Sequence, residues 1–409
     1  MKILHTSDWH LGRTLHDRKR YNEFDSFLGW LIGFIQDEKI DILLVAGDIF
    51  DSSAPGSRAQ EQYYGFLARL MGTCCRHIII IGGNHDSPSF LEAPKEILGA
   101  LRIKVIGAVS GDIADEIYVA KDRDGGTEAI ICAVPFLRDR DIRTVEPGES
   151  PEDKSRKLKE GVANHYRKVH EEAGKLRGDD KNVPLIGMGH LFTAQGRSVE
   201  GDGVRELYIG SIAHIDGQDI SKGFDYMALG HLHMPQAAEG PGNVFYSGSP
   251  VPMGFAEAGQ TKKVIVAEFS GSSPVITGHE IPCFQELERI SGSMEEISDK
   301  IAALKEKGSS AWIEAEVTSP ADPAGIRTRL DELTEGSSME VLRIKNRNFE
   351  AGALKPLHED ETLETLGDRD VFMRCLEASD IPADQHAELL RTYDEATFSM
   401  QMADTNENR

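Results

Sequence analysis

Five short motifs carry the side chains that could do chemistry. They follow one another along the chain as Asp8-x-His10, Gly47-Asp48, Gly83-Asn84-His85-Asp86, Gly189-His190 and Gly230-His231-x-His233. Each motif alone is a weak signal, because such short combinations arise by chance. Together they offer carboxylate and amide oxygens and imidazole nitrogens, with no thiolate, which is the donor set of hard to borderline divalent metals. The motifs therefore predict a metal centre.

The charge of these donors favours two metal ions. If Asp48 bridges two divalent cations and Asp8 is the only other carboxylate, an excess of about two positive charges remains, which suits a hydroxide and an anionic phosphoester. Asn84 fits this balance because an amide oxygen can ligate without adding negative charge. Two ions about 3.5 to 4 Å apart can stabilise both the attacking and the leaving oxygen of an in-line displacement. Phosphoester hydrolysis is the chemistry that follows.

Each motif comes after a short apolar run, and these runs must position it. They cover residues 2–4, 40–46, 77–81, 183–186 and 224–229. Continuous β-branched runs closed by Gly predict buried strands. Helical stretches at 22–38, 57–71 and 152–176 alternate with the runs, so we expect an α/β fold with its ligands at the carboxyl ends of strands.

Two further regions follow the part that carries the motifs. Predicted strands at 284–290, 312–317 and 339–345 enclose predicted helices at 294–306 and 324–334, a β-α-β-α-β pattern. The Gly/Ser/Pro-rich stretch 270–274 is the expected linker. We therefore predict a catalytic domain over 1–275, a smaller α+β capping domain over 276–350, and C-terminal helices with a disordered tail over 351–409.

The C-terminal region contains two amphipathic stripes. One comprises Val371, Phe372, Cys375 and Leu376, and the other comprises Leu389, Leu390, Tyr393 and Ala396. Such stripes pack on their own protein more often than on a partner, and both interpretations stay open at this point.

Length and composition exclude several classes of protein. The 409 residues suit two to three domains at about 150 residues each. Apolar runs are much shorter than the ~20 residues of a membrane span, and MKILHTSDWH does not have the pattern of a secretory signal, so we expect a cytoplasmic protein. The 45 basic and 68 acidic side chains give a net charge of −23, which argues against strong nucleic-acid binding by this chain alone.

The five motifs resemble those of the calcineurin-like metallophosphoesterases, whose blocks read D-x-H, G-D-x-x-D, G-N-H-[DE], G-H and G-H-x-H. Every block is present, including GDIFD with Asp51, where archaeal and eukaryotic relatives commonly carry His. HTSDWHLGRTLHDRKR, VAGDIFDSSAP, DYMALGHLH and YSGSPVPMGF are similar to segments of the bacterial SbcD nucleases, and this resemblance covers essentially the whole chain. It implies an α/β/β/α sandwich with a capping domain.

The resemblance also assigns roles to residues. It implies one metal on Asp8, His10, Asp48 and His233, and a second on Asp48, Asn84, His190 and His231. His85 would support the transition state and protonate the leaving oxygen, a role that suits an imidazole beside cations. Apart from the resemblance, we expect Asp86 to orient the loop or a ligand rather than to touch substrate. Asp51 has no role that the motifs decide.

For function, the resemblance implies a manganese-dependent DNA nuclease subunit. It would act as a 3′-to-5′ exonuclease on duplex DNA and as an endonuclease on single strands and hairpins, in repair, recombination and replication. The SMC-like ATPase SbcC would bind the C-terminal helices and supply ATP-dependent control, with a homodimer of this chain inside a heterotetramer associated with the nucleoid. A phosphomonoesterase or small-molecule phosphodiesterase is the alternative enzyme, and a scaffold without metals is disfavoured because no ligand is missing.

Basic side chains near the motifs are candidates for contacts with the DNA backbone, with an ordinary solvated surface as the alternative. They are Arg13, Arg18, Lys19, Arg20, Arg138 and Arg140. The excess negative charge lies mostly in the second half of the chain, so the global charge does not exclude DNA as substrate. The negative charge does predict that the partner ATPase supplies much of the affinity for DNA.

Overall fold

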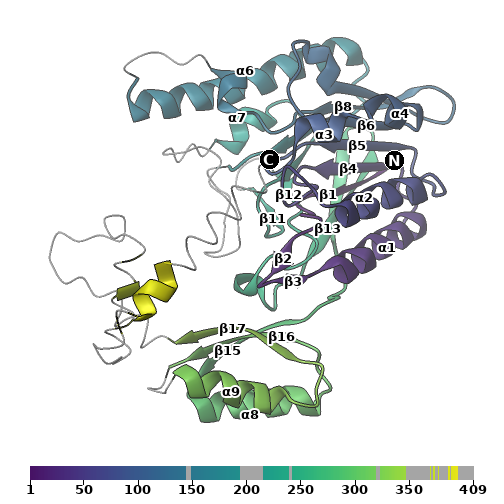
Figure 1. The fold of residues 1–409 in the computed structure, drawn as a ribbon. Helices are drawn as coiled ribbons and strands as arrows, with labels where there is room; N and C mark the ends of the chain where they lie inside the picture. The colour runs from purple at the N-terminus through teal and green to yellow at the C-terminus, as the bar shows by residue number, and fades with distance from the viewer. Residues whose placement is uncertain are drawn as a thin grey trace. The chain divides into compact units, whose positions relative to one another are not determined.

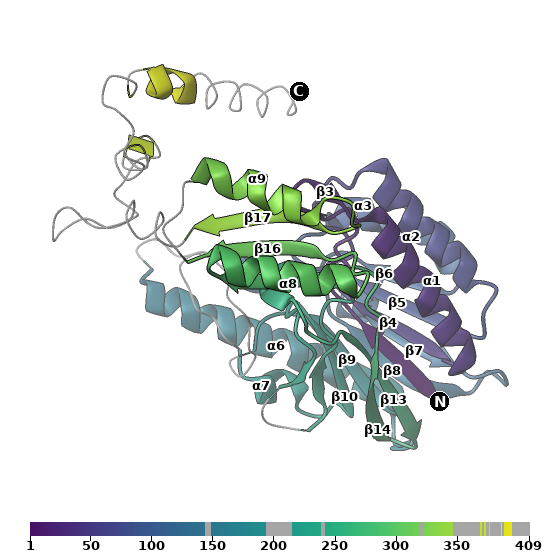
Figure 2. The ribbon, with the colours of Figure 1, turned by 90° about the horizontal axis from the view of Figure 1, so that it is seen from below.

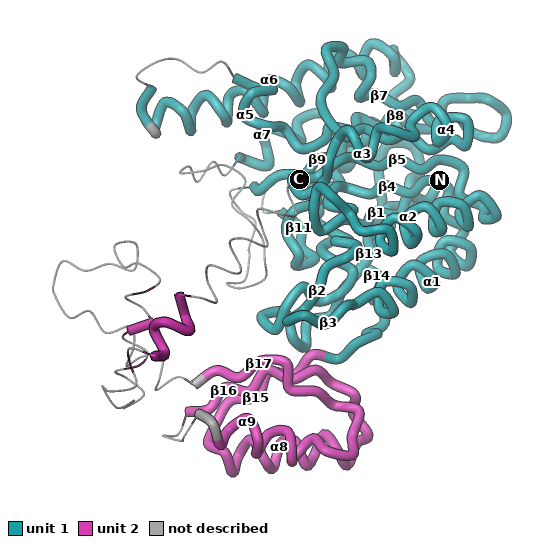
Figure 3. Tube along the Cα trace, in the orientation of Figure 1, with its two compact units in different colours: residues 1–286 teal, residues 287–409 magenta. Residues whose placement is uncertain are grey.

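The structure is a computed structural model. It describes residues 1–143, 149–193, 215–238, 242–318 and 323–346, and further along the chain residues 369, 372, 373, 376, 386 and 388–394. The chain divides into two compact units, residues 1–286 and residues 287–409 (Figure 3).

Unit 1 contains two six-stranded sheets. The first has the order β14-β13-β1-β4-β5-β6, built from β14 (Ser273–Glu280), β13 (Lys263–Ser270), β1 (Lys2–Thr6), β4 (Ile42–Ala46), β5 (His77–Ile81) and β6 (Ile103–Ile106). The second has the order β11-β12-β10-β9-β8-β7, built from β11 (Gln236–Ala237), β12 (Val244–Tyr246), β10 (Tyr226–Gly230), β9 (Leu185–His190), β8 (Thr127–Ala133) and β7 (Ile117–Lys121). The central strands of both sheets run parallel.

Helices cover the outer face of each sheet. The first sheet packs on α1 (Tyr21–Asp37) and α2 (Ser57–Leu70), and the second on α6 (Pro151–Arg177) and α7 (Gly217–Ser221), on the opposite side of the sandwich (Figure 1). Short elements connect these layers: α3 (Pro88–Glu92), α4 (Lys95–Ala100), η1 (Ile113–Glu116), α5 (Asp139–Ile142), η2 (Phe255–Glu257) and the hairpin of β2 (Thr14–Leu15) and β3 (Arg18–Lys19). The predicted α/β/β/α sandwich is confirmed.

Strand β4 shows why the strands that lead into the motifs are unbroken apolar runs. Ile42, Leu44 and Ala46 pack between the two sheets, whereas Leu43 and Val45 point to the helix layer. All five side chains are buried, because the strand has a packed layer on each face. Helix α1, which has solvent on one side, instead buries a stripe of Phe24, Phe27, Leu28, Leu31 and Ile35.

Unit 2 is built on a three-stranded parallel sheet in the order β15-β16-β17. Its strands are β15 (Leu287–Gly292), β16 (Trp312–Val317) and β17 (Glu340–Asn346), and they are connected by α8 (Met294–Glu306) and α9 (Pro323–Thr334). Both helices lie on the same face of the sheet (Figures 1 and 2). Ile297, Ile301 and Leu330 of the helices pack there against Ile313 and Ala315 of β16.

The boundary between the units differs from the sequence-based boundary at 275/276. That position lies inside β14, which pairs with β13 from Lys263 to Ser270, and unit 1 continues to Glu286. The Gly/Ser/Pro-rich stretch is a tight hairpin turn rather than a linker. Ser270 pairs with Ser273 across it, and Gly271 takes a left-handed φ of 67°. Turns and linkers share this composition, so the local sequence could not separate them.

The C-terminal stripes are described in part. The rings of Phe372 and Tyr393 stack with centroids 4.2 Å apart, and Arg369 forms an ion pair with Asp394 at 3.2 Å. Val371, Cys375 and Ala396 lie outside the described residues. In the part of the chain that the structure describes, no helix combines the length and apolarity needed to cross a membrane.

Candidate metal centre

The predicted ligands lie where strands of the two sheets end. Strands β1, β4 and β5 lead into the motifs with Asp8, Asp48 and Asn84, while β9 and β10 of the facing sheet lead into those with His190 and His231. Because parallel neighbours end at the same edge, both sets of side chains meet at one rim of the sandwich. Six of the seven predicted ligands are at most 3% exposed, and Asn84 is half-buried.

Four of these residues have left-handed backbone conformations. Asp8, His10, Asp48 and His231 have φ angles of 53°, 48°, 50° and 103°. Residues with a Cβ rarely adopt this region, and they persist there where surrounding contacts hold them. Here Asp8 N–H donates to Gly47 O at 3.0 Å, His10 N–H to Asp48 O at 3.0 Å, and His231 N–H to Asp8 Oδ1 at 2.8 Å. The strained backbone is thus bonded into place around the site.

Two groups of donor atoms at this rim consist of predicted ligands. Asp8, His10 and His233 form one, and Asp48, His190 and His231 form the other, with the donor atoms of each group within 4.8 Å of one another. A third group of the same kind joins His10 to Asp51 and His85. Asp48 lies between them: its Oδ2 is 3.6 Å from His10 Nε2 and 3.3 Å from His190 Nε2. Asn84 joins the second group, with Oδ1 2.9 Å from His190 Nε2 and 3.3 Å from His231 Nδ1. All seven predicted ligands come together.

Oxygen atoms behind three of the imidazoles orient them. Nδ1 of His10 faces Asp51 Oδ1 at 3.3 Å, Nδ1 of His190 faces Ala46 O at 3.0 Å, and Nδ1 of His233 faces Glu257 Oε1 at 3.4 Å. An oxygen at Nδ1 favours the proton there and leaves the Nε2 lone pair for a metal. Nε2 of His10 and Nε2 of His233 lie only 3.2 Å apart. Converging lone pairs and buried carboxylates fit divalent cations.

Burial and neighbouring charges shift the pKa values of these ligands. Burial raises the pKa of Asp8 to about 6. Burial also disfavours a charged His190, but the Asp48 carboxylate outweighs it and raises the pKa of His190 to about 9. Conversely, burial alone would raise the pKa of Asp48, yet His190 and His10 bring it well below its usual range. Protons on this cluster therefore compete with cations for the same atoms.

His85 lies beside the first group. The residue is 6% exposed, its Nδ1 is 2.8 Å from Asp51 O, and its ring centroid is 4.8 Å from that of His10. Its backbone N–H donates to Asp48 Oδ1 at 2.9 Å. The loop that carries Asn84 is therefore tied directly to the carboxylate between the two groups.

Asp86 holds this loop to the loop after β4. Its carboxylate accepts backbone N–H groups from Gly83 at 2.9 Å, Phe50 at 3.0 Å and Ile49 at 3.1 Å. Burial and the nearby Asp48 charge raise the pKa of Asp86 to about 7. These bonds give Asp86 the orienting contacts that the sequence favoured.

Comparison with known families agrees with this geometry. Residues 1–235 match the calcineurin-like phosphoesterase family, and residues 283–380 match a family described as "Type 5 capsule protein repressor C-terminal domain" (SbcD_C). The SbcD subunit of the nuclease SbcCD of Escherichia coli K12 is 33% identical over 392 residues, which cover 95% of this chain and 96% of that protein. This chain belongs to the SbcD family of calcineurin-like phosphoesterases.

Two other relatives with the same name match a smaller part of the chain. The Rhodobacter capsulatus protein is 35% identical over 279 residues, which cover 67% of each chain, and the Bacillus subtilis protein is 31% identical over 274 residues, or 66% of each. The resemblance inferred from the motifs is confirmed, as is a metal-dependent phosphoesterase domain.

The basic side chains predicted to contact DNA separate into two classes in this SbcD-family chain. Arg20 is a correction: it is 2% exposed, and its guanidinium bonds Glu23 at 2.7 and 2.9 Å and Pro252 O at 2.7 Å, so it cannot reach a phosphate. Arg13 is largely buried too, with Nη1 3.1 Å from Asp51 Oδ1. The exposed candidates are Arg18, Lys19 and Arg140, together with the half-buried Arg138.

Glu257 was not singled out from the sequence. It ends η2, is 1% exposed, and lies behind His233, where no recognisable motif marks it. Burial favours its neutral form, but His233 and Lys262 outweigh this and lower the pKa of Glu257 to about 2. Its neighbourhood of Gly, Ala and Glu resembles an ordinary turn, so only three-dimensional proximity reveals the contact.

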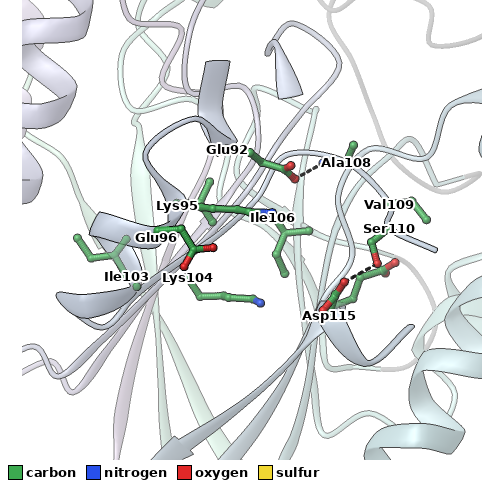
Figure 4. A pocket seen from close by; sticks show the side chains of 13 residues that line it. Glu92, Lys95, Glu96, Ile103, Lys104, Ile106, Ala108, Val109, Ser110 and Asp115 are labelled. Atoms are coloured by element: carbon green, nitrogen blue, oxygen red, sulfur yellow. Dashed lines mark hydrogen bonds between the residues drawn. The ribbon is translucent and has the colours of Figure 1, made fainter. Parts of the chain in front are cut away.

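A pocket of about 410 Å³ lies apart from the metal centre of this SbcD-family chain, between α4, β6 and η1 (Figure 4). Two of its polar side chains bond within the pocket wall: Ser110 Oγ donates to Asp115 Oδ2 at 2.8 Å, and Glu92 Oε1 accepts from Gly107 N–H at 3.0 Å. Its lining residues include none of the predicted ligands, so the site is defined by its donors rather than by this pocket.

Proposed function

We propose that this chain is the nuclease subunit of an SbcCD-type complex and hydrolyses phosphodiester bonds of DNA. The observation that carries this is the pair of adjoining donor groups with Asp48 between them. Membership of the SbcD family adds the substrate class, because the relatives are named nucleases.

The first metal is assigned to Asp8, His10, Asp48 and His233, and the second to Asp48, Asn84, His190 and His231. Mn²⁺ is the proposed ion, since it accepts mixed carboxylate, amide and imidazole donors. Two such ions, when bound, supply an activated water and a counter-charge for the phosphoryl oxygens. The protein's own contribution is to hold the donors in place through strained loops and oxygen-capped imidazoles.

His85 is assigned the general-acid role. Its Nδ1 lies 2.8 Å from Asp51 O, so Nδ1 carries a proton and donates a hydrogen bond to this carbonyl oxygen. In the protonated imidazolium, Nε2 carries the second proton, and it is therefore the ring nitrogen that gives this proton to a leaving oxygen and becomes the lone-pair nitrogen of neutral His85.

The partner proposal concerns the C-terminal helices. The name of the relatives makes each of them one component of a complex, SbcCD, and we assign the partner as an SMC-type ATPase, SbcC, through which ATP acts. The stacked rings of Phe372 and Tyr393 bring one residue of each stripe into contact, which supports a single surface for the partner. The exposed Arg18, Lys19 and Arg140 and the half-buried Arg138 are proposed to contact the DNA backbone, in a homodimer within a heterotetramer acting at the nucleoid.

The deciding experiment compares substrates. The purified chain with Mn²⁺, alone and with SbcC, is expected to degrade linear duplex DNA from its 3′ ends and to cut hairpins, faster than it hydrolyses p-nitrophenyl phosphate or bis-p-nitrophenyl phosphate. Asp8→Ala should abolish cutting, whereas Glu314→Gln, a buried carboxylate of unit 2, should retain it. Turnover of the monoester alone would favour the phosphomonoesterase instead, and intact DNA in every condition would refute the proposal.

A further inference from the structure

Glu257 divides its two carboxylate oxygens between different tasks. Oε2 accepts the backbone N–H of Met253 at 3.0 Å and also bonds Lys262 Nζ. Oε1 is buried and lies 3.4 Å from Nδ1 of His233. A carboxylate needed only to neutralise Lys262 would not require its second oxygen to face an imidazole.

Lys262 holds the backbone of the same histidine. Its ammonium donates to His233 O at 3.0 Å and to Ser249 Oγ at 3.1 Å, and the residue is 4% exposed. Ring and main chain of His233 are therefore both held by one buried ion pair. Removing either partner would leave an uncompensated charge in the interior, which is far more costly than a surface charge.

The same carboxylate is connected to the other histidine of the first metal group. Met253, whose N–H bonds Glu257, accepts Arg13 Nε at its own carbonyl oxygen at 3.2 Å. Arg13 Nη1 in turn bonds Asp51 Oδ1 at 3.1 Å, and Asp51 faces His10 Nδ1. By contrast, His190 of the second group uses a backbone oxygen, Ala46 O, at its Nδ1. Among the described residues, this network contacts the first metal group and not the second.

We propose that Glu257 is a positioning residue for His233. Its carboxylate, neutralised by Lys262, orients the imidazole and keeps the proton on Nδ1 of His233. The lone pair of Nε2 is then left for the first metal. This inference rests on the metal-ligand role proposed above for His233. A carboxylate behind a ligating imidazole fixes its tautomer and increases its basicity, and losing such a partner commonly costs about 10- to 100-fold in metal affinity.

The test is a Mn²⁺ titration of the full-length chain, followed by the electron paramagnetic resonance of free Mn²⁺ and by calorimetry. Wild type is expected to bind two ions. Glu257→Ala should weaken one of the two dissociation constants by about 10- to 100-fold and leave the other unchanged. Glu257→Gln, which keeps an oxygen acceptor, should lose less than Glu257→Ala.

Glu314→Gln is the matched control. Glu314 is also a carboxylate with 1% exposure and cationic partners, Arg289 at 3.0 Å and Arg343 at 3.3 Å, but it lies in unit 2. The Glu314→Gln variant should lower the melting temperature without changing either Mn²⁺ dissociation constant. This result separates the effect of losing a buried charge from the effect of losing the contact with His233.

Circular dichroism shows which variants are folded. A folded Glu257→Ala protein that binds two Mn²⁺ ions with wild-type constants would overturn the inference, as would equal weakening of both sites. If Glu257→Ala does not fold, Glu257→Gln decides by the same two constants, and unchanged values refute the role. A wild-type chain that binds two ions but leaves DNA intact would contradict the proposed nuclease and not this inference.

Discussion

Nδ1 of His85 lies 2.8 Å from the backbone oxygen of Asp51, while the side chain of the same Asp51 faces Nδ1 of His10 at 3.3 Å. One residue thus sets the orientation of both the proposed acid and a proposed metal ligand. The sequence left the role of Asp51 open, and these two contacts give it one. Arg13 adds a bond to the same carboxylate and helps to hold it there.

Replacing His85 should separate chemistry from metal binding. His85→Ala removes the proposed acid but leaves every donor of the two metal groups in place. We expect phosphodiester hydrolysis to fall by about 10²- to 10⁴-fold, the usual contribution of a positioned acid, with Mn²⁺ affinity unchanged. Gel assays on duplex DNA and Mn²⁺ calorimetry on the same preparation measure both quantities. Full activity in this variant would remove His85 from the mechanism.

Gly83 should tolerate no side chain. A Cβ atom there would overlap the carboxylate and the backbone nitrogen of Asp48, and the backbone of neither loop can move without breaking bonds to Asp86. Gly83→Ala is expected to lose about 2 kcal/mol or more of stability, in the range of overpacked cores, and to weaken metal binding. Gly65→Ala, on α2 with open space around it, is the matched control. Urea denaturation and Mn²⁺ titration compare the two.

The buried His5 should make folding sensitive to acid. Its Nδ1 meets Tyr226 OH at 2.9 Å and its Nε2 meets Leu229 O at 3.1 Å, so it joins β1 of one sheet to β10 of the other. Burial lowers the pKa of His5 to about 3. Below a pH of about 6.5, His5 therefore takes up a proton in the unfolded chain, whereas His5 in the folded chain stays neutral. The stability that neutral His5 contributes is complete above a pH of about 6.5 and is lost as the pH falls toward about 3.

The variant His5→Gln lacks this titration. Wild type should exceed it by about 1 to 3 kcal/mol in free energy of unfolding at neutral pH, because two buried hydrogen bonds are disturbed. The difference should shrink by ~1.4 kcal/mol per pH unit below a pH of about 6.5. Urea denaturation in EDTA at about pH 7 and about pH 5 measures it. A difference that stays constant with pH would mean that His5 is protonated equally in both states.

Deleting residues 359–409 should separate the partner from the reaction. The deletion removes the stacked Phe372 and Tyr393 and the Arg369–Asp394 ion pair, all in unit 2, and leaves every donor of unit 1 in place. We expect the shortened chain to lose association with SbcC in size-exclusion chromatography and to retain Mn²⁺-dependent hydrolysis. Co-elution of the shortened chain with SbcC would move the partner surface elsewhere.

The class of fold and the donor set could be predicted from the order of the residues. Unbroken apolar runs such as residues 78–81 are typical of strands covered on both faces, and donors that follow such strands converge at one edge. Local pattern also placed α8 and β16 at the residues where the structure has them. These features depend on side-chain periodicity and chain order, which are written in the sequence.

The side chains that support the donors could be identified only in the folded chain. Glu257 faces His233, Arg20 turns inward to Glu23 and Pro252 O, and the stretch after β13 closes a hairpin instead of separating domains. None of these outcomes has a local signature, because an exposed and a buried Arg, or a turn and a linker, share the same composition. They depend on contacts between residues that are distant in the chain, and packing of the two sheets brings those residues together.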